Sequence, residues 1–180
     1  MKKFKIKIFA DGAKIQDFKN LKKNKLIEGF TTNPSLMKSA GVKNYKDFSK
    51  KVLKLIKKKP VSFEIFADDK KNIEKQALLI SEWGSNVFVK IPIMNTKKTK
   101  NSNLIGKLNQ QGIKLNVTAV FTTKQTKDLL KHIGNKTEII ISVFAGRIAD
   151  SGIDPVEQIK KHIKLCKKYK NIKILWASVR

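Results

Sequence analysis

The stretch Asn86-Val-Phe-Val-Lys-Ile-Pro-Ile93 is an apolar run of the length of one β-strand, with a single ammonium group, that of Lys90, in its middle. A lysine in such a run either reaches solvent at the end of the strand or becomes buried. Burial favours the neutral amine, and a neutral amine is a nucleophile toward carbonyl groups. The stretch therefore predicts a strand and makes Lys90 the first candidate for a catalytic residue.

Other β-branched runs alternate with helical patterns along the whole chain. Apolar residues recur at helical spacing between the runs, and Gly84, Gly112 and Gly134 fall where helices are expected to end in left-handed caps. Asp154-Pro-Val-Glu157 predicts a helix start, followed by the apolar stripe Val156, Ile159, Ile163 and Cys166. The predicted strands are Phe4–Asp11, Leu26–Thr32, Val61–Ala67, Asn86–Ile91, Ile113–Val120, Glu138–Ala145 and Ile172–Ser178.

Repeated βα units predict an α/β fold in which parallel strands are covered by outer helices. An open doubly wound sheet and a (β/α)₈ barrel of the TIM type both satisfy this pattern. The Gly-rich phosphate turn of a dinucleotide-binding sheet is missing after the first strand, where Ala10-Asp-Gly-Ala13 stands instead. Polar residues gather at the C-terminal ends of several strands, which is where a barrel builds its active site. We therefore expect the barrel, as a single domain over residues 1–180.

The composition is that of a globular chain with a very basic surface. Of its residues 41% are hydrophobic, but no apolar stretch approaches the ~20 residues of a membrane span, so we expect no membrane association. The single cysteine excludes a disulfide framework and is typical of a cytoplasmic protein. The net charge of +26 is compatible with nucleic-acid binding, but the lysines are spread over nearly every helix and no nucleic-acid motif is present. We expect a solvated lysine surface and no specific nucleic-acid partner.

Only two of the forty basic residues are arginines, Arg147 and Arg180, and each follows a predicted strand. A guanidinium group binds an anion with a rigid pair of donors. The strand ends add a lysine, the carboxylates Asp11 and Glu64, and several amide and hydroxyl groups. If a closed barrel brings these groups together, they suit Schiff-base carbon–carbon chemistry on a phosphorylated sugar.

Five motifs, in this order along the chain, resemble those of the transaldolase family. They are Gly29-Phe-Thr-Thr-Asn-Pro-Ser35, Val89-Lys-Ile-Pro92, Leu115-Asn-Val-Thr118, Ile141-Ser-Val-Phe-Ala-Gly-Arg147 and Trp176-Ala-Ser-Val-Arg180. The resemblance covers nearly the whole chain, and it implies an enzyme that needs neither a metal nor an organic cofactor.

The resemblance also implies a role for each matching residue. Lys90 would form the Schiff base with a ketose donor, and Asp11 would exchange the hydroxyl proton during carbon–carbon cleavage. Glu64 and Thr118 would hold and activate a water molecule. The remaining residues would bind the sugar phosphate. Its dihydroxyacetone unit would contact Asn33, Asn116 and Ser142, in a pocket that Phe144 also lines. Its phosphate would be bound by Arg147, Ser178 and Arg180.

A related branch, the fructose 6-phosphate aldolases, has short chains like this one. That branch typically carries glutamine, glycine and tyrosine at the positions of Glu64, Asn116 and Phe144, whereas this chain has the transaldolase type at all three. We therefore expect a transaldolase. An aldolase that uses free dihydroxyacetone and a non-catalytic polyanion-binding protein are the alternatives.

Seven strands are predicted, and the family continues beyond the seventh with further helices and an eighth strand. We therefore expect a C-terminally truncated sequence, with a barrel closed by a partner chain as the alternative, and a homo-oligomer in the full-length form. Three other features suggest no catalytic role. Cys166 is expected in the core, His132 and His162 lack partner ligands at metal spacing, and the Asp68-Asp69 pair is expected to cap a helix, with a divalent metal site as its alternative.

Overall fold

The computed structural model describes residues 5–179, which form seven strands and eight helices. The strands are β1 (Ile8–Asp11), β2 (Ile27–Thr31), β3 (Val61–Glu64), β4 (Val87–Pro92), β5 (Leu115–Val120), β6 (Ile139–Phe144) and β7 (Ile172–Ala177). The helices are α1 (Ile15–Leu21), α2 (Pro34–Ser39), α3 (Tyr45–Leu55), α4 (Lys70–Ser81), α5 (Ser102–Gln110), α6 (Thr123–Leu129), α7 (Ala145–Asp150) and α8 (Pro155–Cys166).

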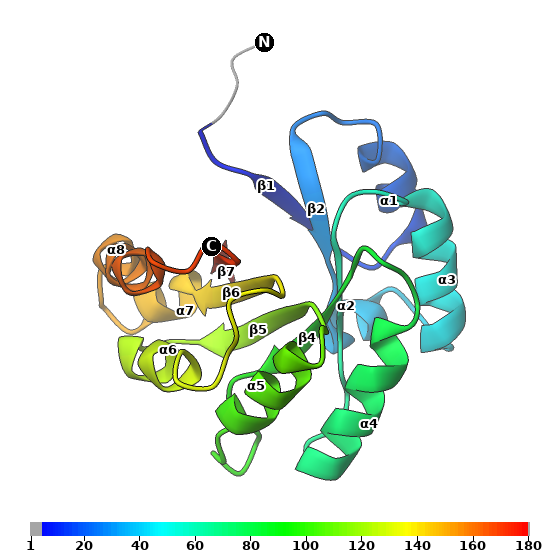
Figure 1. Cartoon of the computed structure of the whole chain (residues 1–180). Coiled ribbons are helices and arrows are strands. Elements are labelled where there is room, and N and C mark those ends of the chain that lie inside the picture. Colours follow the sequence, from blue (N-terminus) through cyan, green and yellow to red (C-terminus); the bar gives the residue numbers. More distant parts are fainter. Residues whose placement is uncertain (1–4, 180) are drawn as a thin grey trace.

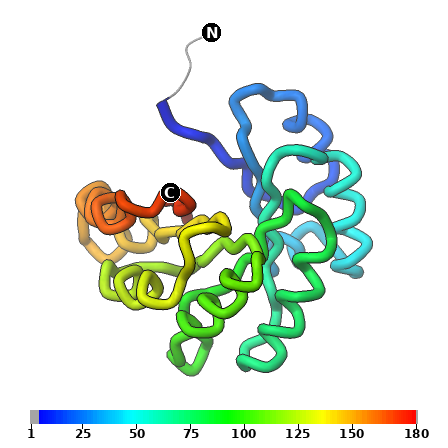
Figure 2. Tube along the Cα trace, viewed as in Figure 1, coloured from blue at the N-terminus to red at the C-terminus, as the bar shows by residue number. Residues whose placement is uncertain are grey.

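The seven strands form one sheet in which the spatial order equals the order along the chain, and every neighbouring pair is parallel. The sheet curls, and the helices lie around its outer side (Figure 1). The Cα trace shows the same arrangement as one continuous winding from β1 to β7 (Figure 2). The predicted fold class is confirmed: this is an α/β fold of the (β/α)₈ type, with seven strands in the described part.

The alternation of side chains along each strand separates the core from the inner face of the sheet. Val89 and Ile91 of β4 are fully buried, as are Val61 and Phe63 of β3, and they belong to the hydrophobic core formed with the helices. The residues between them, such as Lys90, point to the opposite face because the period of a strand is two. The polar residues of the strands are therefore directed into the interior of the curled sheet.

All seven predicted strands are present, but two of them differ from the predicted bounds by three residues or more at one end. The first was predicted from Phe4, which lies outside the described residues, and the strand begins only at Ile8. The third was predicted to continue to Ala67 but ends at Glu64. The backbone N–H groups of Phe66 and Ala67 donate to the side chain of Gln76 at 2.8 and 3.0 Å, so the chain turns toward α4 instead of extending the sheet.

Two smaller expectations need correction. Gly112 has the left-handed conformation (φ +87°) predicted for a helix cap, but Gly84 and Gly134 do not have positive φ angles. The stripe on α8 is not a buried face. Cys166 is buried, whereas Ile163 is 52% exposed. Within residues 5–179 the strands β1 and β7 each pair with only one neighbour, so the sheet has an open side. Ile163 lies next to β7 along this open side.

Candidate active site

The predicted site residues converge on one open cavity of about 1880 Å³ inside the curled sheet. The parallel strands all end on the same side, so side chains far apart in the sequence meet there. Of the predicted residues, those lining the cavity are Asp11, Asn33, Glu64, Lys90, Thr118, Ser142, Phe144, Arg147 and Ser178. Asn116 is fully buried next to Lys90, its register partner on β4, and Arg180 lies outside the described residues.

Lys90 lies in the middle of β4 and is 8% exposed. Its Nζ is 3.0 Å from Oε2 of Glu64 and donates a hydrogen bond to the backbone carbonyl of Thr32 at 3.2 Å. The sheet register fixes this pair, because Glu64 and Lys90 are direct partners across β3 and β4. The amine therefore points into the sheet interior beside a carboxylate, and not outward to solvent.

Burial raises the pKa of the Glu64 carboxyl above its ordinary value, and the nearby charge of Asp11 acts in the same direction. The ammonium of Lys90 opposes the effect but does not cancel it. A carboxylate with a raised pKa holds a proton more readily at neutral pH. Glu64 is thus suited to accept the proton that Lys90 must lose to become a nucleophile.

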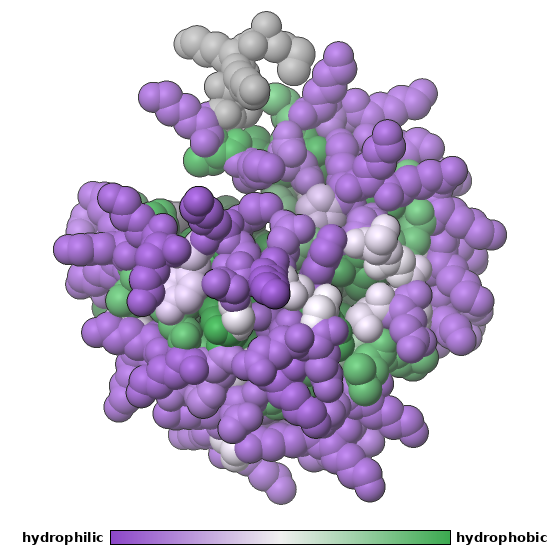
Figure 3. Space-filling view, viewed as in Figure 1, coloured by the Kyte–Doolittle hydropathy of each residue, from purple (hydrophilic) through white to green (hydrophobic). Residues whose placement is uncertain are grey.

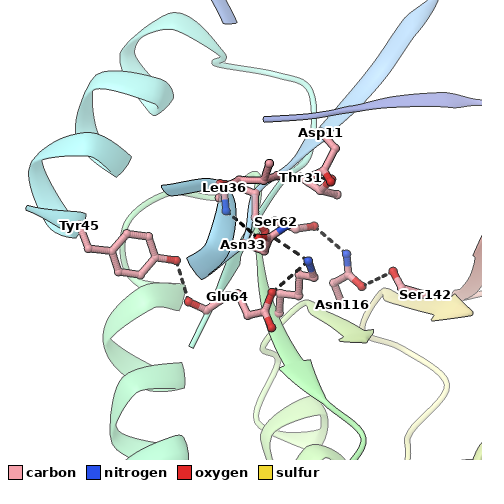
Figure 4. Close-up of polar contacts among 11 residues, drawn as sticks. Asp11, Thr31, Asn33, Leu36, Tyr45, Ser62, Glu64, Asn116 and Ser142 are labelled. Atoms are coloured by element: carbon pink, nitrogen blue, oxygen red, sulfur yellow. Dashed lines mark hydrogen bonds and ion pairs between the residues drawn. The ribbon is translucent and has the colours of Figure 1, made fainter. Parts of the chain in front are cut away.

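Asn116 is buried within a chain of hydrogen bonds that joins three strands. Its Nδ2 donates to the Ser62 hydroxyl at 3.0 Å, and its Oδ1 accepts from the Ser142 hydroxyl at 2.7 Å (Figure 4). All three side chains are buried. These hydrogen bonds hold the amide of Asn116 in one orientation, and Ser142 lines the cavity.

Asp11 and Asn33 stand at the mouth of the cavity. Asp11 is the last residue of β1, and its Oδ1 accepts a hydrogen bond from Thr31 at 2.8 Å. Asn33 caps α2, where its Oδ1 accepts from the backbone N–H of Leu36 at 2.9 Å. The cap fixes the side chain, so the amide nitrogen of Asn33 is the atom that can be offered to a ligand.

Two buried hydroxyl groups at the site have no hydrogen-bond partner among the described residues, those of Thr32 and Thr118. An unpaired buried hydroxyl is costly unless a ligand or water satisfies it. Thr118 lines the cavity and is followed by Ala119, whose φ of +55° marks an irregularity of β5. On the next strand, the ring of Phe144 packs edge-to-face against Phe121 at a centroid distance of 5.6 Å.

Arg147 lies at the rim, on α7 directly after β6, with a side chain that is 61% exposed. Its guanidinium is 3.8 Å from Oδ2 of Asp150, one turn along the same helix. Such an exposed pair is weak, so an anionic ligand can displace it. Ser178 follows β7 with a positive φ of +57°, at the same rim.

The residues that were expected to have no catalytic role lie apart from this site. Cys166 is buried in the core as predicted. His162 is fully buried, and its Nδ1 lies 2.8 Å from the Thr126 hydroxyl. Asp69 caps α4 through the backbone N–H of Asn72. Residues 5–179 contain no group of three or more His, Cys, Asp and Glu side chains that could hold a metal ion, and none of their helices is long and apolar enough to cross a membrane.

Sequence reasoning missed two residues that support the site. Ser62 precedes Glu64 by two residues on the same face of β3, so the period of the strand contains the information that would have found it. Tyr45 donates a hydrogen bond from its hydroxyl to the backbone carbonyl of Glu64 at 2.8 Å. Its position at the start of α3 gives no such indication, because the contact depends on how the helix packs.

Comparison with known proteins points to one family. The family model for transaldolase/fructose-6-phosphate aldolase matches residues 8–180. A probable transaldolase of Dehalococcoides mccartyi is 32% identical over 97% of this chain and 78% of its own length. The corresponding protein of Nitrosopumilus maritimus is 36% identical over 97% of this chain and 75% of its own length.

Among solved structures, dihydrodipicolinate synthase from Rhodopseudomonas palustris aligns with a TM-score of 0.49 and 14% identity. The alignment covers 93% of this chain and 62% of that chain. With a family match that begins at the first strand and relatives above 30% identity along nearly its whole length, this chain belongs to the transaldolase/fructose-6-phosphate aldolase family.

Proposed function

We propose that this chain is a class I transaldolase that moves a dihydroxyacetone unit from a ketose phosphate to an aldose phosphate through a Schiff base on Lys90. The observation that carries the proposal is the buried Lys90–Glu64 pair, with its N–O distance of 3.0 Å, at the wall of the cavity. A carboxylate of raised pKa next to a buried amine is a base that can take a proton from it and leave a nucleophile.

In the first half of the reaction, Glu64 accepts a proton from the Lys90 ammonium. The neutral amine then adds to the ketone carbon of the donor to form a carbinolamine. Glu64 returns the proton to the departing hydroxyl, and water leaves as the protonated imine forms. Thr118, whose buried hydroxyl has no partner among residues 5–179, is placed to hold that water.

In the second half, Asp11 accepts the proton of the substrate hydroxyl next to the bond that breaks. Cleavage of this carbon–carbon bond releases an aldose phosphate and leaves an enamine on Lys90. The enamine adds to the aldehyde of a second aldose phosphate, and Asp11 returns the proton to the new hydroxyl. Water then hydrolyses the protonated imine, which releases the new ketose phosphate and restores the Lys90 ammonium.

The remaining residues are assigned to binding. Asn33, Asn116 and Ser142 are proposed to form hydrogen bonds with the hydroxyls of the dihydroxyacetone unit. The bond that Ser142 donates to Asn116 holds both side chains in place. Arg147, Ser178 and Arg180 are proposed to bind the phosphate, and Arg147 and Ser178 stand at the rim where a phosphate would project. The sugar phosphates would be handled in the cytoplasm, and we propose a homo-oligomer for the full-length form.

Transfer, rather than aldol cleavage with free dihydroxyacetone, is supported by the residue types at three positions. Glu64, Asn116 and Phe144 are those of the transaldolase branch, and the relatives named above are described as probable transaldolases. Phe144 lines the cavity with an apolar ring. A phenyl ring cannot deliver a proton to the enamine as a tyrosine hydroxyl could, so the three-carbon adduct persists until an acceptor arrives.

The proposal is tested by trapping the imine. Borohydride added with fructose 6-phosphate should attach the donor fragment to the peptide that contains Lys90, as read by mass spectrometry. Lys90→Met should abolish the label. Lys173→Met is the matched control, because Lys173 also lines the cavity and pairs with a carboxylate, Glu138, yet has no assigned role. A label on another lysine, or none, would contradict the mechanism.

A coupled assay separates the two activities of the family. With fructose 6-phosphate as donor, glyceraldehyde 3-phosphate should exceed one equivalent per active site only when an aldose phosphate such as erythrose 4-phosphate is present as acceptor. Condensation of free dihydroxyacetone with glyceraldehyde 3-phosphate at a comparable rate would instead identify an aldolase.

A further inference from the structure

The carbonyl of Glu64 occupies a place in the sheet where its regular hydrogen-bond donor is missing. Along β2 and β3, the N–H of Phe30 donates to the carbonyl of Pro60 at 2.9 Å, and the N–H of Thr32 donates to that of Ser62 at 3.2 Å. A parallel ladder advances by two residues on each strand. The next donor would be residue 34 and the next acceptor would be Glu64, but residue 34 is a proline, which has no N–H.

Tyr45 supplies the missing donor. Its hydroxyl donates to the Glu64 carbonyl at 2.8 Å (Figure 4), a distance typical of a well-formed hydrogen bond. The other edge of β3 continues its ladder past this point, since the N–H of Ile65 donates to the carbonyl of Lys90 at 3.1 Å. The backbone on either side of Glu64 is therefore held by Tyr45 on one side and by β4 on the other.

The ring of Tyr45 is itself fixed by three aromatic neighbours. It packs edge-to-face against Phe66 and Trp83 at centroid distances of 5.0 and 5.2 Å, and against Phe63 at 6.2 Å. The phenol stays protonated, because burial and the nearby Glu64 charge both raise its pKa. A rigid, neutral donor suits a positioning role, whereas a hydroxyl on a mobile surface side chain would not.

We propose that Tyr45 is a positioning residue that acts through the Glu64 backbone, holding the end of β3 so that the Glu64 carboxylate stays within reach of the Lys90 amine. The proposal rests on the function proposed above, because only there does the Lys90–Glu64 distance matter for a reaction. Tyr45 does not line the cavity, so its contribution is to the position of Glu64 and not to substrate binding.

The test is Tyr45→Phe, which removes one hydroxyl and keeps the ring. We expect kcat for transfer to fall about five- to tenfold, the effect of one neutral hydrogen bond, with KM changed less than twofold. The charge of Lys90 lowers the pKa of the Glu64 carboxyl. If the variant lets the two side chains move apart, this lowering becomes smaller. The acid limb of the pH profile should therefore move to higher pH by about half a unit.

Two control variants separate positioning from general stability. Tyr169→Phe changes the only other tyrosine of the chain, which lies next to Lys168 and far from the site in the sequence, and it should leave kcat and the pH profile unchanged. Trp83→Phe removes part of the packing around the Tyr45 ring but leaves the Tyr45 hydroxyl in place. It should lower the unfolding temperature without moving the acid limb. If Tyr45→Phe behaves like Trp83→Phe, Tyr45 is merely structural and the proposal fails.

Two measurements keep the proposal testable if the enzyme is inactive or the variant does not fold. The Glu64 carboxyl can be titrated by ¹³C NMR without substrate, and its pKa should be higher in Tyr45→Phe; an unchanged value overturns the proposal even if trapping at Lys90 succeeds. In the Tyr169→Phe background, 3-fluorotyrosine labels residue 45 alone. The more acidic phenol should shift the Glu64 backbone carbonyl resonance, and an unmoved resonance would exclude the hydrogen bond.

Discussion

At the scale of single residues, Lys90 and Glu64 depend on each other. Their side chains are 10% and 15% exposed and lie 3.0 Å apart, so removing one partner leaves the other buried without its counter-charge. Such a loss costs about 3 kcal/mol or more. The Glu64 carboxyl has a folded-state pKa above the ordinary 4.5. A carboxyl of this kind stabilises the fold when protonated, and that stabilisation is lost as the pH rises through the folded-state pKa.

We therefore predict a pH-dependent loss of stability in Lys90→Met. Without the ammonium, the pKa of Glu64 should rise further, so the variant should lose about 3 kcal/mol of unfolding free energy at pH 8 and clearly less at pH 5. Urea unfolding at the two pH values measures the difference. Lys173→Met, which breaks an exposed pair with Glu138, should cost less than about 1 kcal/mol at both. Equal losses for Lys90→Met at pH 5 and pH 8 would contradict the raised pKa.

Cys166 offers a second prediction at this scale. It is 5% exposed, and burial raises the pKa of its thiol to about 11. Since the thiolate is the reactive form, native Cys166 should react with iodoacetamide at pH 8 at least about a hundredfold more slowly than in urea-unfolded protein. Mass spectrometry of the alkylated cysteine peptide measures both rates. Rapid labelling of the native chain would show that α8 opens readily.

Much of the site was predictable from residue types, and the unpredicted part has a clear physical cause. Lys90 and Glu64 stand out because a charged group interrupts an apolar strand, and a buried charge needs a partner. The period of β3 places Ser62 on the same face as Glu64, but its partner Asn116 lies 54 residues away, and Glu64 lies 19 residues from Tyr45. Such contacts depend on strand register and helix packing, which local sequence does not specify.

At the scale of elements, the strands were predicted well and their ends poorly. A strand interior is specified by apolar alternation, whereas its end depends on which group captures the next backbone N–H. For β3 this group is the side chain of Gln76, ten residues beyond Phe66. The apolar stripe of α8 shows a different limit. Helical spacing predicts a face, but exposure of Ile163 shows that no described element covers this part of it.

The irregular end of β5 permits a prediction about Ala119. Its φ of +55°, within the break in pairing between Val117 and Val120, places an alanine in the left-handed region. That conformation costs an L-residue roughly 1–2 kcal/mol, while glycine pays a smaller entropic cost. Ala119→Gly should therefore raise the unfolding free energy by about 0.5–1 kcal/mol, measured in urea. Ala10→Gly, in β1 without a positive φ, is the control and should lower it. A loss in Ala119→Gly would show that the alanine is unstrained.

At the scale of the whole molecule, the net charge opposes association between copies of the chain, whereas exposed apolar surface favours it. Hydrophilic side chains cover most of the face in Figure 3, and the net charge of +26 makes two copies repel at low ionic strength. Along the open side of the sheet, however, Ile163 of α8 and Trp176 of β7 are exposed, and β7 pairs on one side only within residues 5–179. Unpaired strand edges next to apolar surface are sites of association between chains.

Raising the salt concentration should therefore increase association between chains, because salt screens the charge repulsion and leaves the apolar attraction unchanged. We predict that the average mass from static light scattering rises between about 0.05 M and 0.5 M NaCl. Ile163→Lys should reduce the rise at equal protein concentration. Leu79→Lys, on α4 away from the open side and similarly exposed at 48%, adds the same charge and is the matched control. If both variants reduce the rise equally, the added charge is responsible and the open side is not the contact surface; if only Ile163→Lys does, association proceeds through the surface beside β7.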